Sequence, residues 1–315
     1  MYSGRQWLTI LLSGGTTAFA FMMALSGSIG GMFLSNFTQL PLFLAGLSLG
    51  MTGTIAAAAV ASGVLLIAGV SVGVPLLLIL YAAPTIILTR QAVLSRPDGQ
   101  GGQEWYPAGL LLLWATGIAV VLLTVGFILL SSGAESIEAG IRQLLDQVFQ
   151  RMMPTGKAEQ RQLLVDAISP FLPGISAAMW ILLVAVNGSL AQGLLVRGQR
   201  NMRPSPDLAT LELPRALLFV LAIAVAAGVL LPGSLGYFGR NIAVVLGVPY
   251  FFAGLGVLHF LSRRHPAGVL LLFLCYMILI LLSLFFKWPT IAVAMVGVLD
   301  QWTDLRHRLR NRGPD

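Results

Sequence analysis

Four polar side chains lie in or beside long apolar runs, where they could bind a ligand. His259 is the histidine well inside such a run, and an imidazole there can hold a ligand, transfer a proton or make a hydrogen bond in packing. Asn187 can contact a solute or join two helices through its amide. Tyr250 adds a hydroxyl near His259, and Arg240 could anchor an anionic substrate or extend to the surface. These four residues are the predicted ligand-binding set, and a structural role is the alternative for each.

Asp300 and Asp304 form a second candidate site, since a spacing of four residues places both carboxylates on one face of a helix. Two acids in that arrangement resemble a general acid/base pair or a cation site. Arg308 follows four residues later, and an acid and a base at that spacing form a surface pair on a helix. Trp302 lies between the acids, as is typical of a membrane interface. We favour a structural collar at the membrane surface, with a docking surface or a cavity gate as the alternative.

Motifs of enzyme chemistry are sparse. The chain has no HExxH metal motif, no Walker A phosphate loop and no run of paired acids that would hold magnesium. Its single cysteine, Cys275, lies inside an apolar run and cannot form an internal disulfide. No acid lies in the middle of an apolar run, which argues against a proton-coupled pump. We expect no enzyme activity, no cofactor and no metal site.

The composition indicates what kind of element must position these residues. Of the 315 residues, 57% are hydrophobic and 10% are charged, and the mean hydropathy is +0.87. Soluble proteins have about 25% charged residues, so a water-soluble fold could not hide this much apolar surface. The net charge of +7 would suggest nucleic acid on a soluble chain, but here the bases lie in short loops and at the C-terminus. The expected partner is therefore the lipid bilayer, not nucleic acid.

The apolar runs predict an all-α, polytopic helix bundle that forms a single transmembrane domain over residues 1–315. About 20 apolar residues cross the hydrocarbon layer as a helix, and on that measure we predict about ten spans, within a range of nine to eleven. Pro84 is expected to kink the fourth span, and the alanine-rich third span is expected to pack against protein. The predicted spans are residues 7–29, 39–50, 52–70, 74–89, 108–130, 171–196, 215–231, 241–262, 266–286 and a short tenth around 291–299.

Residues 134–170 differ from the rest because apolar side chains recur at helical spacing among charged ones. A Pro-Thr-Gly break at 154–156 divides the segment into two amphipathic pieces. We predict a helical hairpin inserted into the domain, lying on the membrane surface or capping the bundle. The alternative is a lid or a docking surface for a partner.

The basic residues predict the orientation. They cluster at Arg5, residues 90–96, residues 197–215, Arg263 with Arg264, and a basic tail at 303–315. Ten spans with both termini cytoplasmic place every cluster inside, so residues 134–170 are expected to be extracytoplasmic. We further expect Asp300 to contact a cytoplasmic loop through Arg90 or Arg263.

The last predicted span carries a resemblance to a known family. Gly297, Asp300, Trp302, Asp304 and Arg306 fit the pattern G-x-x-D-x-W-x-D-[FL]-R, and the segment LPLFLAGLSLG precedes an alanine-rich helix near the N-terminus. On these features the chain resembles the YybS-type family of bacterial predicted membrane proteins, whose function is unknown. The first four runs are also similar to the substrate-binding subunits of energy-coupling-factor vitamin transporters. The second resemblance implies a bacterial inner membrane.

Two functions from different classes fit these observations. The first is a small-molecule binding or transport component, in which the four polar residues named first line a cavity in the membrane. The second is a structural or assembly scaffold that binds a membrane protein partner through residues 134–170 or the basic tail. We favour the first on the fold resemblance alone, which is an analogy and not a mechanism.

Overall fold

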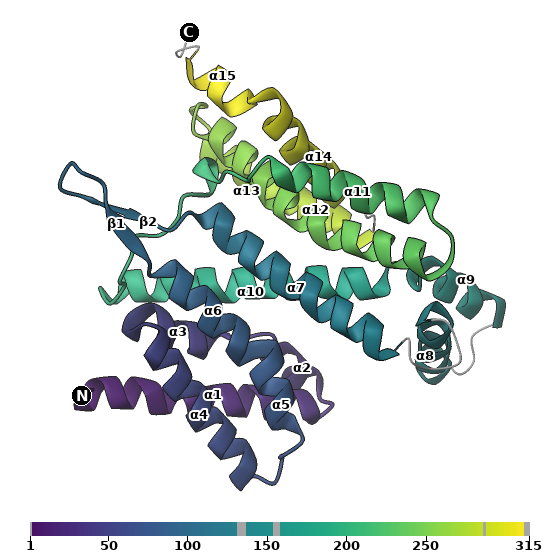
Figure 1. Ribbon diagram of the computed structural model, residues 1–315, viewed down its shortest axis with the longest axis horizontal. Helices are drawn as coiled ribbons and strands as arrows, with labels where there is room; N and C mark the ends of the chain where they lie inside the picture. The colour runs from purple at the N-terminus through teal and green to yellow at the C-terminus, as the bar shows by residue number, and fades with distance from the viewer. Residues whose placement is uncertain (1, 131–136, 154–157, 286–287, 312–315) are drawn as a thin grey trace. The chain divides into compact units, whose positions relative to one another are not determined.

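The computed structural model describes residues 2–130, 137–153, 158–285 and 288–311. Regular structure in these ranges is helical apart from one short hairpin, which agrees with the predicted all-α class (Figure 1). The hairpin pairs β1 (Ser95–Pro97) with β2 (Gln103–Trp105) in antiparallel fashion. It follows the basic residue Arg90 in the chain. Its turn closes because the Asp98 carboxylate accepts 2.8 Å hydrogen bonds from the backbone N–H groups of Gln100 and Gly102.

Internal contacts divide the chain into two compact units, and each is described by itself. Unit 1 comprises Met1–Ala115 and Leu182–Asp207, and unit 2 comprises Thr116–Ile181 and Leu208–Asp315. Two long helices, α7 (Ala108–Leu130) and α10 (Leu172–Arg197), contribute residues to both units.

Unit 1 is built mainly from short apolar helices. Besides parts of α7 and α10, they are α1 (Gly4–Leu25), α2 (Ile29–Ser35), α3 (Leu40–Leu49), α4 (Met51–Ile67), α5 (Gly73–Leu77), the π-helix η1 (Leu78–Ala82) and α6 (Ala83–Ala92). α1 begins at a capping box, in which Ser3 and Gln6 bond each other's backbone N–H groups. Ala57 and Ala61 of α4 are fully buried, which confirms that the alanine-rich helix packs against protein.

Pro84 disturbs its helix where the sequence predicts a kink. Proline has no N–H group, and its ring clashes with the preceding turn of a helix. Here the π-helical turn η1 lies immediately before α6, whose second residue is Pro84. The Tyr81 carbonyl in that turn accepts hydrogen bonds from the side chains of Thr85 (2.7 Å) and Gln39 (3.4 Å). The neutral side chains of Thr85 and Gln39 therefore supply hydrogen-bond donors to a backbone carbonyl of the irregular turn.

Arg203 fixes the base of the β-hairpin within unit 1. The residue is 6% exposed, and its guanidinium donates to the carbonyls of Ala92 (2.9 Å) and Tyr106 (3.4 Å), which flank the hairpin. Its own carbonyl accepts a 2.7 Å hydrogen bond from the Gln192 amide. Burial lowers the pKa of Arg203, because the charged guanidinium loses hydration there.

Unit 2 centres on the long helix α12 (Gly233–Ser262), beside which α11 (Ala216–Leu230) and α14 (Trp288–Thr303) pack (Figure 1). A Cβ atom on Gly254 would collide with the carbonyl of Val293, and one on Gly297 would collide with that of Tyr250. These two glycines therefore let α12 and α14 cross with their backbones in contact. The other elements are α8 (Ile137–Met152), α9 (Ala158–Ile168), the 3₁₀ turn η2 (Leu208–Thr210), α13 (Gly268–Phe285) and α15 (Leu305–Asn311).

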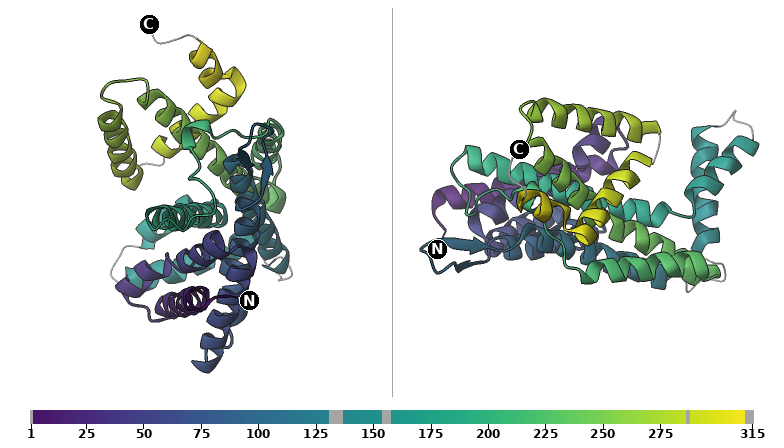
Figure 2. Two further views of the ribbon diagram at one scale, coloured as in Figure 1. Left: turned by 90° about the vertical axis from the view of Figure 1, so that its left-hand side faces the viewer. Right: turned by 90° about the horizontal axis from the view of Figure 1, so that it is seen from above.

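Helices α8 and α9 occupy the segment predicted as two amphipathic pieces, and we call them the amphipathic pair. Arg142 of α8 and Asp166 of α9 form an ion pair. At the start of α8, Ile137 packs with Phe127 and Tyr237. Figure 2 shows that α8 runs crosswise to α12, whereas α11 runs along it.

Several helices match the dimensions of a bilayer. The described residues include six helices that are long and apolar enough to cross a membrane: Gly4–Leu25, Ile29–Leu49, Gly73–Ala92, Ala108–Leu129, Leu172–Arg197 and Gly233–Ser262. Shorter apolar helices are Met51–Ile67, Ala216–Leu230 and Gly268–Ser283. The second predicted span, 39–50, is the latter part of the helical stretch 29–49. The membrane class is thus supported, while the count of about ten spans stays a prediction.

Candidate functional site

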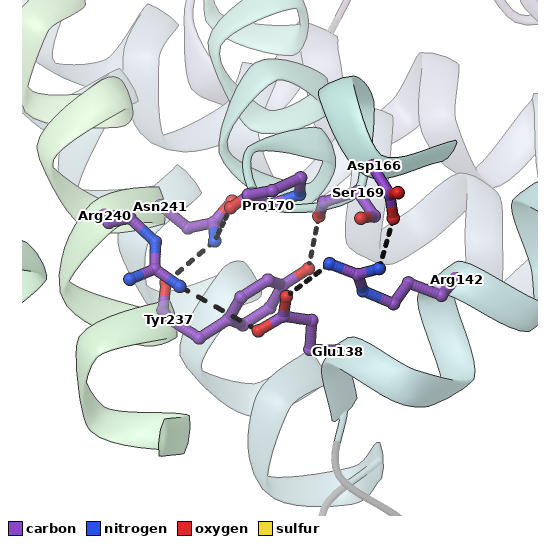
Figure 3. Close-up of polar contacts among 8 residues, drawn as sticks. All are labelled: Glu138, Arg142, Asp166, Ser169, Pro170, Tyr237, Arg240 and Asn241. Atoms are coloured by element: carbon purple, nitrogen blue, oxygen red, sulfur yellow. Dashed lines mark hydrogen bonds and ion pairs between the residues drawn. The ribbon is translucent and has the colours of Figure 1, made fainter. Parts of the chain in front are cut away.

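Polar side chains of unit 2 gather at both ends of α12, and those near its start form what we call the corner cluster (Figure 3). Tyr237, Arg240 and Asn241 share one face of α12, because they lie three and four residues apart. They meet the amphipathic pair and the turn that joins α9 to α10. The members of the cluster are Glu138, Arg142, Asp166, Ser169, Pro170, Tyr237, Arg240 and Asn241.

The buried part of the corner cluster is neutral. The Tyr237 hydroxyl donates to the carbonyl of Ser169 (2.8 Å), and the Asn241 amide donates to that of Pro170 (3.0 Å). The side-chain oxygen of Asn241 accepts a 2.7 Å hydrogen bond from the backbone N–H of Gly174, in the first turn of α10. Helix ends leave backbone groups without partners inside the helix. α12 therefore supplies those partners where α9 ends and α10 begins.

The charged part of the corner cluster is half-exposed. Arg240 lies 3.8 Å from Glu138, and Arg142 contacts both Glu138 (3.3 Å) and Asp166. These side chains are between 30% and 47% exposed, so water screens the pairs. Burial acts to lower the pKa of Arg142, but hydrogen bonds to Asp166 and Glu138 outweigh it and raise the pKa above its usual value.

Toward its other end, α12 packs against a segment that holds a buried ion pair. The side chains of Asp300 and Arg306 are 6% and 12% exposed, and the Arg306 Nε and Nη2 atoms each lie 2.8 Å from Asp300 Oδ2. The same guanidinium donates to the carbonyls of Ala209 (2.9 Å) and Leu211 (2.8 Å). Arg306 therefore joins the segment around η2 to the end of α14.

This pairing depends on a break after α14. Asp304 has a φ of 51°, a left-handed conformation that aspartate tolerates better than most residues. The turn brings the backbone N–H and side chain of Arg306 back to Asp300. The Asp304 carboxylate lies 3.4 Å from the guanidinium of Arg215. The predicted side-chain pair of Asp304 with Arg308 is not among the ion pairs of the described residues, because the Asp304 carboxylate contacts Arg215 instead.

A pocket of about 260 Å³ lies beside the ion pair, and we call it the tail pocket. Glu212, Arg215, Asp304 and Arg310 bring charges of both signs to its lining. Gln301 also lines it, and the side-chain oxygen of this residue is buried without a hydrogen-bond partner among the described residues. The remaining lining residues are Ala209, Thr210, Leu213, Ala253, Gly297, Asp300, Arg306 and His307.

Two of the predicted ligand-binding residues bond the backbone, in different units. Asn187, in unit 1, donates a 2.8 Å hydrogen bond to the carbonyl of Asn36. His259, in unit 2, has its Nδ1 atom 2.9 Å from the carbonyl of Leu255, one helical turn earlier. Both contacts are ones that structural packing would provide.

The other two predicted ligand-binding residues belong to α12. Tyr250 is fully buried, and its hydroxyl has no hydrogen-bond partner among the described residues. Arg240 pairs with Glu138 and donates to the carbonyl of Gly228 (3.3 Å), so it does not extend freely to the surface. None of the four predicted residues lines the tail pocket.

Asp300 has a different partner from the one predicted. The sequence prediction paired it with Arg90 or Arg263, but its carboxylate binds Arg306 in its own segment. The prediction treated the segment as a continuous helix, in which residues six apart lie on different faces. The left-handed residue between them removes that restriction.

The neutral members of the corner cluster, Tyr237 and Asn241, were not predicted from the sequence. Tyr237 and Arg240 lie in residues 232–240, between the predicted spans 215–231 and 241–262, so the helix face that they share with Asn241 was not predicted. The partners of Tyr237 and Asn241 are backbone carbonyls of the turn before α10, which carry no sequence signal. Only the fold reveals that contact.

A serine motif in unit 1 lacks the geometry of a hydrolase. Residues 46–50, Gly-Leu-Ser-Leu-Gly, match GxSxG, but that motif acts on a sharp turn between a strand and a helix. Ser48 instead lies within α3, and its hydroxyl donates a 2.6 Å hydrogen bond to the carbonyl of Leu44. Among the residues that the structure describes, no group of three or more His, Cys, Asp or Glu side chains could hold a metal ion.

Comparison with known proteins identifies the family. A family model described as a predicted membrane protein (DUF2232) matches residues 16–301, which include the corner cluster and Asp300. No curated protein and no solved structure matches the chain. The similarity to energy-coupling-factor subunits is therefore not shown, whereas the resemblance to a family of predicted membrane proteins is confirmed. The chain belongs to this DUF2232 family of predicted membrane proteins, whose function is unknown.

Proposed function

We propose that this multi-pass membrane protein binds a small zwitterionic solute in the tail pocket. The observation that carries the proposal is the lining, in which two arginines, Arg215 and Arg310, share one pocket with the carboxylates of Glu212 and Asp304. A solute that carries a positive and a negative charge can pair with the carboxylates and with the arginines of this lining. A simple anion or cation would also meet side chains of its own sign, which is unfavourable.

The size of the pocket limits the solute. Sites for drug-sized ligands occupy about 300–1,000 Å³, so a pocket of about 260 Å³ suits a molecule of amino-acid size. The lining groups are available, because Arg215 and Asp304 are 81% and 58% exposed and lie 3.4 Å apart. Such a pair contributes little stability, so exchanging it for a solute costs little. Asp300 and Arg306 already satisfy each other, and they position the wall of the pocket.

Ligand-dependent stability of the purified protein in detergent tests the proposal. The probes are zwitterionic amino acids, inorganic phosphate as the anion and spermidine as the cation. We expect an amino acid to raise the midpoint of thermal unfolding, because a ligand that binds only the folded state stabilises it. The rise should be lost in both Arg215→Gln and Glu212→Gln and kept in Arg151→Gln, an exposed arginine on α8.

Three outcomes would contradict the proposal. One is that no amino acid stabilises the wild-type protein. Another is that the stabilisation persists in both pocket variants, which would place the solute elsewhere. The third is that phosphate stabilises the protein and only the arginine variant abolishes the effect, which would make the ligand an anion.

We also propose that the tail pocket faces the cytoplasm of a bacterial cell, with both termini on that side of the inner membrane. The support is the clustering of basic residues in alternate connections and in the tail. A fluorescent protein fused to the C-terminus should then fluoresce. Activity of alkaline phosphatase at the same position would contradict this orientation.

The alternative, an assembly scaffold, needs a protein partner on the amphipathic pair or on the basic tail. Its support is that α8 leaves Leu144, Val148 and Met152 exposed. The short connection from α9 to the candidate span α10 holds the amphipathic pair near the bilayer. This location favours lipid as the neighbour of the exposed face of α8. We therefore place solute binding first.

A further inference from the structure

We infer that α8 is an in-plane membrane helix, whose exposed apolar side chains lie at the boundary between lipid headgroups and acyl chains. This surface is independent of the tail pocket. It is formed by Leu144, Val148 and Met152, which are 57%, 41% and 72% exposed.

The exposed residues continue an apolar stripe that the protein covers only in part. Ile137 and Leu145, on the same side of α8, are 8% and 9% exposed. Leu144, Val148 and Met152 follow at spacings of four residues, so they extend this stripe along one helix face. A helix with one apolar face and one polar face can lie in a membrane interface.

The position of α8 next to the bilayer follows from its connections. Three residues separate the end of α9 at Ile168 from the start of α10 at Leu172, and a chain of that length reaches about 14 Å at most. α10 and α12 are both candidate membrane spans. α12 also bonds the turn between α9 and α10 through Tyr237 and Asn241. The amphipathic pair is therefore held at the ends of two spans.

The direction of α8 fits the same location. Figure 2 shows α8 crosswise to α12, so a bilayer that α12 crosses would have α8 roughly along its surface. Polar side chains occupy the face opposite the stripe, where Gln143 and Gln150 are exposed. Lipid on one side and water on the other would satisfy both faces of the helix.

The charges of α8 indicate which property of the lipid matters. Within the corner cluster, the carboxylates of Glu138 and Asp166 are balanced by the guanidinium groups of Arg142 and Arg240. The polar face therefore offers no block of basic residues of the kind that attracts anionic lipid. We expect apolar contact to hold α8, with similar insertion into neutral and anionic membranes.

Spin-label accessibility in vesicles tests this inference. Cysteine is placed at Leu144, Val148 or Met152, with Gln143 and Gln150 as matched controls on the opposite face, in a background where Cys275, the free cysteine, is serine. Each labelled protein is reconstituted into phosphatidylcholine vesicles, after its thermal midpoint is compared with that of the parent. Collision rates with oxygen, which enters lipid, and with a water-soluble nickel chelate are then measured.

We expect the ratio of oxygen to nickel accessibility to be several-fold higher at the three apolar positions than at the two controls. The ratio should stay the same when phosphatidylglycerol is added. Nickel accessibility equal to that of the controls would show water on the apolar face and overturn the inference. Exclusion of both reagents would show a protein neighbour and overturn it too, and dilution with lipid would then identify a second copy if access returned.

Discussion

The two ends of α12 are secured by different chemistry, although each end contacts segments that are distant in sequence. At the start of the helix, the buried contacts of Tyr237 and Asn241 are neutral, and the charged contacts of Arg240 are half-exposed. Near the other end, the ion pair of Asp300 and Arg306 is itself buried. The ion pairs are thus half-exposed in the corner cluster, whereas the ion pair beside the tail pocket is buried.

This difference suggests what each end does. A buried ion pair costs desolvation energy, and it persists only where its remaining hydrogen bonds are satisfied. Arg306 meets that condition through the carbonyls of Ala209 and Leu211. The pair therefore gives the tail pocket a fixed polar wall. The corner cluster needs no buried charge, because its task is to hold the turn between α9 and α10.

The largest effect should come from Asp300→Asn. It leaves the Arg306 guanidinium buried without a counter-charge, and removing one partner of such a pair costs about 3–5 kcal/mol. The matched control is Asp304→Asn, which removes an exposed carboxylate and should cost less than about 1 kcal/mol. Reversible unfolding in mixed micelles measures both. Equal losses would show that the two carboxylates are equivalent and would contradict the difference between buried and exposed charge.

The next largest effect should come from Asn241→Leu. The change leaves the buried N–H of Gly174 without its side-chain partner, which costs about 1–3 kcal/mol, and it removes the hydrogen bond to the half-buried carbonyl of Pro170. Gln143→Leu on the exposed face of α8 is the control, with no expected loss. The same unfolding measurement applies. A loss of stability for Asn241→Leu no larger than for this control would mean that the turn before α10 keeps its conformation without the Asn241 side chain.

Tyr237→Phe should have a smaller effect. It removes one hydrogen bond, to the carbonyl of Ser169, and keeps the ring that packs with Phe127. A single buried hydrogen bond contributes about 1 kcal/mol. Hydrogen exchange of residues 165–175 should rise with the loss of stability, and unchanged exchange there would show that the bond does not secure the turn.

Glu138→Gln sharpens the contrast between exposed and buried charge. The Glu138 side chain is 30% exposed and lies 3.8 Å from Arg240, so the expected loss is less than about 1 kcal/mol. The loss should shrink further at about 1 M salt, which screens exposed charges over about 3 Å. The effect of Asp300→Asn should persist in the same salt. Equal salt sensitivity of the two variants would contradict the assignment of buried and exposed pairs.

The smallest effect concerns a fully exposed pair in unit 1. The hydrogen bond and charge of Arg96 lower the pKa of Glu104 below its ordinary 4.5. The pair therefore stabilises the β-hairpin fully above that ordinary pKa, and the stabilisation is lost as the pH falls through the lowered folded pKa. Exchange of residues 94–106, corrected for intrinsic rates, should rise between about pH 7 and about pH 3. Glu104→Gln should abolish this rise; a rise that persists in it would have another origin.

Much of the fold class was predictable, because composition and apolar runs respond directly to the bilayer. The buried alanines of α4 and the helix disturbance at Pro84 follow from local side-chain size and the missing N–H. The amphipathic character of α8 follows from the spacing of its apolar residues. These features need no knowledge of long-range contacts.

The candidate site was much less predictable, because its contacts depend on one backbone conformation and on distant packing. Asp300 meets Arg306 only because Asp304 is left-handed, and helical periodicity hides that arrangement. Arg240 meets Glu138 only because α8 folds back against α12. The predicted ligand set therefore contained Arg240 and omitted every residue of the tail pocket.

A pair of double-mutant cycles tests whether buried charge builds the pocket end of α12 while exposed charge only borders the other end. One cycle combines Asp300→Leu with Arg306→Met, and the other combines Glu138→Leu with Arg240→Met. We predict a coupling energy of about 3 kcal/mol or more in the first cycle and below about 1 kcal/mol in the second. A coupling in the second cycle equal to or larger than that in the first would contradict this prediction.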